Sequence, residues 1–304
     1  MNSQRRTLIF TNGYKISINL YHSLILISLI ILTSCLPRAE TVAHNDTPQR
    51  IVSLVPAVTE ILFAIGAGDK VVGVTRYCDY PPEAASRTSV GGFAGATVSI
   101  EQIQLLQPDL VMLSVDMHER IVALLDSLNI PSFAVEPRNF SQVFETIEVL
   151  GSLTGFESGA EKVISEMKLK LERVEERIRG LEPVSVFWLL WQDPLMSAGA
   201  NTFISEAVSL AGGRNIFADV NELWPLVSPE QVLVRRPDWI IAGNDLEGFV
   251  SFSGSFWQAV PAVREGRIAF VNADIFYRYG PRLADGVEAI AEILHGSART
   301  ADCP

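Results

Sequence analysis

A short motif that occurs twice in the chain constrains its fold more than any other feature. Ser-Ile-Glu-Gln at residues 99–102, followed by Pro-Asp at 108–109, recurs 129 positions later as Ser-Pro-Glu-Gln at 228–231, followed by Pro-Asp at 237–238. Each copy has a serine suited to capping a helix and a glutamine three residues later, which predicts a capping box, a short helix, a turn and a strand. We therefore expect two units of similar design, each with a glutamate in the first turn of the repeated helix.

Short apolar runs alternate with helical patterns on both sides of this motif. The apolar runs lie at residues 51–55, 71–74, 110–113, 132–135, 184–190, 239–242 and 268–271. Helical spacing separates them, for example at residues 59–67, 120–128, 203–210 and 287–294. Such alternation is typical of parallel sheets flanked by helices. The expected fold is α/β, with two similar parallel-sheet lobes at residues 50–156 and 182–296 and a polar tail at 297–304.

Residues 157–181 are expected to connect the two lobes as one long helix. Residues 157–179 are rich in Glu, Lys and Leu, contain no proline, and keep apolar side chains at Val163, Met167, Leu171 and Val174. A helix of about 23 residues would be roughly 35 Å long, which is enough to cross from one lobe to the other. The same pattern also suits a coiled-coil segment for dimerisation, and this alternative stays open.

Charge and motif content argue against several functional classes. The net charge of −11 and the pI near 4.9 argue against a nucleic-acid-binding protein, because binding to phosphates requires a surplus of Lys and Arg. The four histidines and three cysteines lack metal-ligand spacing, so neither a cofactor nor a structural metal is expected. The sequence has no GxSxG, no HExxH and no phosphate-binding glycine loop with a lysine, so no enzymatic activity is expected.

Residues 1–34 have the features of an export signal. Basic residues precede an apolar run at residues 24–32, which is shorter than the roughly 20 residues that span a membrane. The run ends in Leu32-Thr33-Ser34-Cys35, which resembles a bacterial lipobox and implies cleavage before Cys35 and acylation of its thiol. Residues 35–49 would then tether the protein, in the periplasm or on the outer face of the cell membrane. The alternative is an ordinary secretory signal peptide followed by a cysteine that is not lipidated.

Aromatic residues gather in segments with the composition of loops. They stand beside Gly, Pro or Asp rather than inside the periodic runs, and they are Tyr77, Tyr80, Phe93, Trp191, Trp224, Phe276, Tyr277 and Tyr279. Ligands of parallel α/β sheets bind beyond the carboxyl ends of the strands, where such loops meet. Two lobes with aromatic loops therefore predict a cleft, although any one of these rings taken alone suits a packing role at least as well.

Several of these segments resemble the bacterial solute-binding proteins that deliver iron chelates and cobalamin to ABC importers, in particular the BtuF-like cobalamin-binding proteins. The resemblance covers residues 50–296, and the segments that carry it are residues 50–60, 77–83, 224–228 and 276–282 and both copies of the repeated motif. It implies the two-lobed fold with a single connecting helix, known as class III, a shallow cleft between the lobes and only a small closing motion.

Matched position by position, the resemblance implies two sets of functional residues. The implied ligand-binding residues are Ala57, Tyr77, Phe93, Trp191, Trp224, Asp274 and Arg278. The implied docking residues are Glu101 and Glu230, one for each subunit of an ABC permease dimer, whose arginines they would pair with.

Alternatives for these residues stay open at this point. The two glutamates also suit the first turn of any helix, and Asp274 and Arg278 could form only a surface ion pair. Phe93 and Ile275 depart from aromatic residues that relatives often carry, and Arg76 stands where relatives often have a histidine, so no metal ligand is expected there.

The expected function is capture of cobalamin or a related corrinoid outside the cytoplasm and its delivery, unchanged, to an ABC permease. A ferric siderophore or haem is the alternative ligand, but a strongly anionic chelate would need several convergent bases, and this acidic chain offers few. More distant alternatives are an enzyme acting on a tetrapyrrole and a surface scaffold lipoprotein. The protein is expected to be a monomer that does not bind nucleic acid, with Cys78 as a partly buried free thiol and Cys303 exposed.

Overall fold

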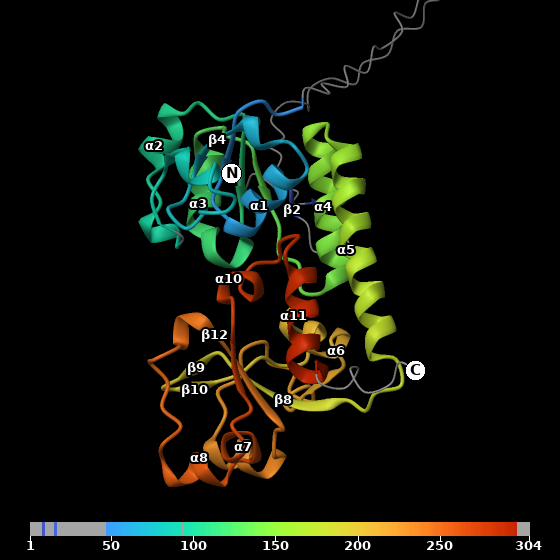
Figure 1. Cartoon of the computed structure of the whole chain (residues 1–304). Coiled ribbons are helices and arrows are strands. Elements are labelled where there is room, and N and C mark those ends of the chain that lie inside the picture. The colour runs from blue at the N-terminus through green and yellow to red at the C-terminus, as the bar shows by residue number, and fades with distance from the viewer. Residues whose placement is uncertain (1–7, 10–14, 17–46, 93, 297–304) are drawn as a thin grey trace, which may run out of the picture.

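The computed structural model describes residues 8–9, 15–16, 47–92 and 94–296 of the chain (Figure 1). Most of the predicted signal segment, the proposed lipidation site Cys35, the cleft residue Phe93 and the tail at residues 297–304 lie outside the described residues. Within them, no helix combines the length and the hydropathy that crossing a membrane requires.

The first lobe is built on a mostly parallel sheet with helices on both faces. Its strand order is β1-β2-β7-β6-β3-β4-β5. The parallel strands are β3 (Ile51–Ser53), β4 (Val71–Val74), β5 (Thr88–Ser89), β6 (Leu110–Leu113) and β7 (Ser132–Ala134), and the antiparallel edge strands are β1 (Leu8–Ile9) and β2 (Lys15–Ile16). β3 and β6 are buried on both faces, which explains why β6 is a continuous apolar run rather than an alternating one.

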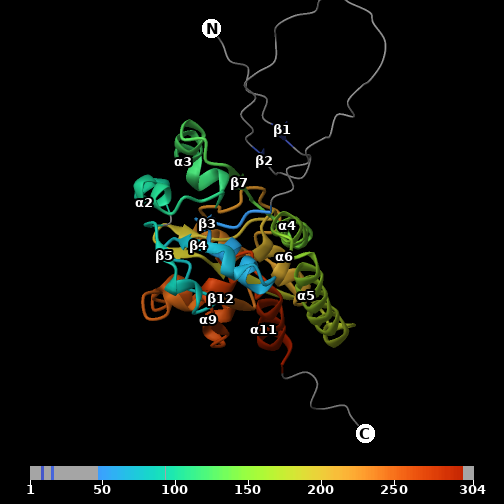
Figure 2. The same cartoon turned by 90° about the horizontal axis from the view of Figure 1, so that it is seen from above.

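Helices cover both faces of this first sheet. Figure 2 shows α2 and α3 on one side and α4 and α5 on the other, and each side has its own apolar core. The helices of the lobe are α1 (Pro56–Ala64), α2 (Ile100–Leu105), α3 (Val115–Ser127) and α4 (Phe140–Thr154), with short 3-10 turns η1 (Gly68–Lys70), η2 (Ala84–Ser86) and η3 (Gly95–Thr97).

The second lobe repeats this design on a smaller sheet. Four parallel strands follow the order β11-β8-β12-β13, with β8 (Val184–Leu189), β11 (Gly213–Asn215), β12 (Trp239–Gly243) and β13 (Ile268–Val271). A separate hairpin pairs β9 (Trp191–Gln192) with β10 (Leu195–Met196). The helices are α6 (Phe203–Leu210), α7 (Pro229–Arg235), α8 (Ser255–Ala259), α9 (Pro261–Arg264), α10 (Ala273–Phe276) and α11 (Leu283–His295), with η4 (Asn244–Leu246).

One long helix, α5 (Glu157–Ile178), runs beside both lobes (Figure 1). Its 22 residues make it roughly 33 Å long. Val163 and Met167 belong to the core of the first lobe, whereas Val174, two to three turns later, belongs to the core of the second. The prediction of two parallel-sheet α/β lobes joined by one long helix is therefore confirmed.

The two copies of the repeated motif form helices α2 and α7. In α7 the capping box is complete, because Ser228 Oγ accepts from the Gln231 N–H at 3.3 Å and Gln231 Oε1 accepts from the Ser228 N–H at 2.8 Å. In α2 only half of it forms. Ser99 Oγ accepts from the Gln102 N–H at 3.2 Å and donates to Glu101 Oε2 at 2.9 Å, and no return bond from the Gln102 side chain occurs among the described residues.

The segment between α10 and α11 ties the second lobe back to the first. Tyr279 and Ala284 are buried in the first lobe's core. Arg282 donates to Glu60 Oε2 of α1 at 2.7 Å, and Glu60 keeps only 3% of its side chain exposed. The Arg282 guanidinium also lies 3.7 Å from the centre of the Tyr80 ring. These contacts hold the lobes together beside the cleft.

Candidate ligand-binding cleft

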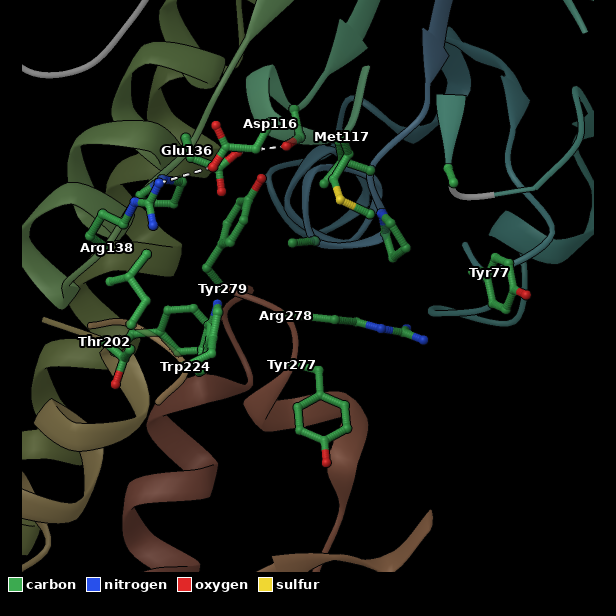
Figure 3. Close-up of a pocket in the computed structure, with 18 of the residues that line it drawn as sticks. Tyr77, Asp116, Met117, Glu136, Arg138, Thr202, Trp224, Tyr277, Arg278 and Tyr279 are labelled. Carbon is green, nitrogen blue, oxygen red and sulfur yellow. Dashed lines mark hydrogen bonds and ion pairs between the residues drawn. The ribbon is translucent and has the colours of Figure 1, made fainter. Parts of the chain in front are cut away.

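A cavity of about 900 Å³ lies between the two lobes. Its first-lobe wall comes from residues that follow β3, β4, β6 and β7, so it sits beyond the carboxyl ends of four parallel strands, the usual ligand position in such sheets. Its second-lobe wall comes from the loop before α6, the loop before α7 and the segment after α10. Figure 3 shows Asp116, Glu136 and Arg138 on one side of the cavity and Thr202, Trp224 and Tyr277 on the other.

Four of the predicted cleft residues line this cavity, namely Ala57, Tyr77, Trp224 and Arg278. Asp274 does not line it but accepts a hydrogen bond from Arg278 at 2.8 Å. Trp191 is not part of the lining either. It lies half-exposed in β9, and its Nε1 donates to the Asp193 carbonyl at 2.8 Å. The structure thus brings together one ring from each lobe, Tyr77 and Trp224, on opposite walls.

Arg278 is the most constrained polar side chain of the cavity. Its guanidinium is nearly buried and donates to Asp79 of the first lobe at 2.7 Å as well as to Asp274. Because α10 ends at Phe276, the Asp274–Arg278 pair is not the exposed helix-surface pair that the spacing allowed, and it bridges onward to the opposite lobe. Two carboxylates therefore neutralise this guanidinium and fix its position.

A cluster of acids on the first-lobe wall was not predicted from the sequence. Ser114 follows β6 and donates through Oγ to Glu136 Oε2 at 2.6 Å, and Arg138 pairs with Asp116 Oδ2 at 3.1 Å. Burial raises the pKa of the Glu136 carboxyl and the nearby Asp116 charge adds to the rise, whereas the Ser114 bond and Arg138 oppose it. The signal that could have found these residues is their position just after two apolar runs, at the carboxyl ends of predicted neighbouring strands.

Tyr277 contributes a protonated phenol to the cavity wall. Burial, together with the carboxylate of Asp245, raises the pKa of Tyr277 to about 12. The phenol therefore keeps its proton at neutral pH and donates a hydrogen bond to Asp245, so Tyr277 presents an apolar ring face to the cavity and not a charge.

Comparison with known proteins assigns the chain to a family. The family model described as periplasmic binding protein matches residues 51–275, which include the first lobe, α5, most of the second lobe and the cavity lining except Tyr277, Arg278 and Tyr279. The chain belongs to the periplasmic binding protein family. It is 32% identical over 264 residues to the uncharacterized ABC transporter substrate-binding lipoprotein YvrC of Bacillus subtilis, covering 84% of this chain and 83% of the relative.

Two solved structures of periplasmic binding proteins share this fold closely. The periplasmic vitamin B12 binding protein BtuF of Vibrio cholerae superposes with a TM-score of 0.73 at 30% identity, covering 84% of this chain and 99% of that one. The periplasmic heme-binding protein RhuT of Roseiflexus sp. RS-1 superposes with a TM-score of 0.71 at 26% identity, covering 83% and 99%. The predicted membership in the solute-binding proteins of ABC importers is confirmed.

Within this periplasmic binding protein, Glu101 and Glu230 lie on exposed surfaces of different lobes. The backbone N–H of Glu101 and the Ser99 hydroxyl hold the pKa of its carboxyl below the usual range, and the backbone N–H of Glu230 and Ser228 do the same at the second site. Each carboxylate is followed one turn later by an exposed apolar side chain, Leu105 at 75% and Val234 at 79%, again 129 positions apart.

Cys78 lies in the first lobe's core, close behind Tyr77. Its thiol is buried and lies 3.2 Å from Thr75 Oγ1. Burial raises the pKa of the Cys78 thiol. The Cys78 side chain is thus fully buried, whereas the sequence predicted a partly buried thiol. It packs in the first lobe's core and points toward the sheet rather than toward the cleft.

Proposed function

We propose that the protein captures cobalamin or a related corrinoid outside the cytoplasm and hands it, chemically unchanged, to an ABC permease. The observation that carries this proposal is the interlobe cavity of about 900 Å³, with Tyr77 and Trp224 facing it from opposite lobes. A large flat macrocycle needs broad apolar and aromatic contact and a few polar groups that fix its orientation. The vitamin B12 binding protein among the similar structures supports the choice of ligand.

Haem is the second candidate ligand, because a heme-binding protein is also among the similar structures. Haem carries two propionates, which bases would have to meet. Of the three arginines at the cavity, Arg278 is already bound to two carboxylates and Arg138 to one, which leaves one lining arginine, Arg76, without an ion pair to a described residue. This arrangement favours the corrinoid.

Trp224→Ala is expected to weaken cyanocobalamin binding at least about tenfold, because a buried aromatic anchor at the centre of an interface contributes about 2 kcal/mol or more. Calorimetric titration of a soluble form starting at Thr47 measures this, with haem and a ferric hydroxamate titrated in parallel. Phe249→Ala removes an exposed ring that does not line the cavity and is the matched control. Saturable binding of haem alone, with no heat from cyanocobalamin, would replace the corrinoid by haem.

The same titrations address the remaining predicted cleft residues. We propose that Ala57, Tyr77 and Arg278 contact the ligand and that Asp274 positions Arg278. Trp191 lies outside the cavity lining, so an effect of Trp191→Ala would mean that the β9–β10 hairpin moves toward the bound ligand.

The proposed anchor at Cys35 keeps the protein next to its permease. The lipobox-like tetrapeptide and the lipoprotein among the relatives support it. Cys35→Ala is expected to move most of the protein from the membrane fraction to the soluble fraction of fractionated cells, because an acyl chain supplies the attachment. Failure of the wild-type protein to incorporate a labelled fatty acid would overturn the anchor.

Docking on the permease is assigned to Glu101 and Glu230. Both carboxylates are exposed, ionise readily and occupy equivalent positions of the two lobes, so one can face each subunit of a permease dimer. Leu105 and Val234 place an apolar side chain beside each of them, as expected for a contact that joins a charge pair to a small apolar patch.

A further inference from the structure

The first-lobe wall of the cavity carries two carboxylates, and one of them, Glu136, forms no ion pair with any described residue. Glu136 and Asp116 both line it, on segments that follow the adjacent strands β7 and β6. Figure 3 shows the two acids next to each other, with Arg138 beside them. A ligand that fills the cavity must place part of its periphery against this pair.

The arginines of the cavity are largely committed to carboxylates of the protein. Arg138 pairs with Asp116, and Arg278 binds Asp79 and Asp274 at 2.7 and 2.8 Å. Arg76 is the one lining arginine without an ion pair among the described residues, and its side chain is exposed. An anionic group entering the cavity would therefore meet few guanidinium donors that are not already bound.

Glu136, in contrast, has a carboxylate oxygen that can still accept a hydrogen bond from a ligand. Ser114 Oγ donates to Oε2 at 2.6 Å, and no described residue donates to Oε1. The side chain is half-buried in a mainly apolar cavity, where hydrogen bonds to a charged group are stronger than in water. An N–H donor, such as a primary amide, can satisfy this open carboxylate oxygen.

We propose that Glu136, with Asp116 beside it, makes this cavity select macrocycles whose peripheral arms end in amides over macrocycles whose arms end in carboxylates. An amide arm donates to Glu136 Oε1, whereas a carboxylate arm is repelled by the Glu136 carboxylate, whose charge no described arginine pairs with. This inference rests on the proposed function, since it names the corrinoid arms that the cavity recognises. Glu136, which determines this specificity, is not among the ligand-binding residues predicted from the sequence.

Two corrinoids that differ mainly in their arms test this selection. Dicyanocobinamide carries amide arms and dicyanocobyrinic acid carries carboxylate arms on the same ring with the same axial ligands. The wild-type protein is expected to bind the amide form at least about tenfold more tightly, because juxtaposed like charges are strongly unfavourable. Glu136→Gln is expected to reduce the ratio of the two affinities, amide form over carboxylate form, about tenfold. Glutamine carries no charge and can donate a hydrogen bond to a carboxylate.

The direction of the change separates specificity from damage to the fold. A merely structural defect would weaken both ligands, whereas the proposed role predicts weaker binding of the amide form and tighter binding of the carboxylate form. Asp116→Asn is expected to shift the ratio the same way, since it also frees Arg138. Glu148→Gln removes the same charge from an exposed face of α4, away from the cavity, and is expected to leave the ratio unchanged.

The titrations distinguish a failure of the specificity role of Glu136 from a failure of corrinoid binding as such. If both corrinoids bind and Glu136→Gln leaves their ratio at the wild-type value, the specificity role is overturned and the proposed function stands. If neither corrinoid binds the wild-type protein, the proposed function itself is overturned and this inference with it.

Discussion

Arg282→Ala is expected to lower the free energy of unfolding by about 3–5 kcal/mol, the usual cost of breaking a buried ion pair from one side. The partner carboxylate of Glu60 is almost completely buried in the first lobe, where Arg282 Nη2 donates to it at 2.7 Å. Removing the guanidinium leaves that charge without its counter-ion and also removes the contact with the Tyr80 ring. Chemical denaturation of the soluble protein, followed by circular dichroism, measures the loss.

Two further variants show whether the buried charge causes this loss. Glu60→Met combined with Arg282→Met is expected to recover much of the lost stability, because replacing both partners by apolar residues leaves no unpaired charge. Arg264→Ala breaks an exposed pair with Glu265 at 4.0 Å and is expected to cost less than about 1 kcal/mol. A loss below about 1 kcal/mol for Arg282→Ala would contradict a stabilising role for the pair.

The largest functional effect is expected from removing both docking carboxylates. Glu101→Ala combined with Glu230→Ala should reduce cobalamin uptake by cells at least about a hundredfold, because each carboxylate would lose a charge-assisted contact with the permease. Ligand affinity should stay within about twofold of the wild type, since neither residue lines the cavity. Uptake of labelled cobalamin and titration of the purified variant give the two readouts.

A matched control exists for this double variant. Glu157 is also an exposed glutamate in the first turn of a helix, α5, but it has no counterpart 129 positions away. Glu157→Ala is expected to leave uptake unchanged. Each single docking variant should lie between the wild type and the double variant, because the permease keeps one of its two contacts. Normal uptake by the double variant would show that the two glutamates only stabilise the first turns of α2 and α7 and do not contact the permease.

The elements of the fold were predictable where local sequence determines them. β6 is buried on both faces and therefore appears as a continuous apolar run, β8 is apolar except for Ser185, and α5 keeps an uninterrupted helical pattern. The β9–β10 hairpin was missed because the apolar run of β8 continues into Trp191 without a recognisable turn before Asp193-Pro194. The short helix α10 was missed because four residues carry too little periodicity.

The candidate site was only partly predictable, for a different reason. Tyr77 and Trp224 were found because an aromatic ring in a loop is conspicuous in the sequence itself. The partners of the charged residues could not be found this way, because Arg278 binds Asp79 across 199 positions and Arg282 binds Glu60 across 222. Asp116 and Glu136 meet only because β6 and β7 are adjacent in the sheet. Such pairings depend on the order of the strands, which composition and spacing do not contain.

The helix α5 also determines where this chain can be divided. Its first half completes one apolar core through Val163 and Met167, and its second half completes the other through Val174. A cut before α5 would deprive the first lobe of part of its core, and a cut after α5 would deprive the second. The lobes resemble each other in design, yet they share α5, and a chain trimmed to either lobe without this helix would expose a stripe of apolar residues to water.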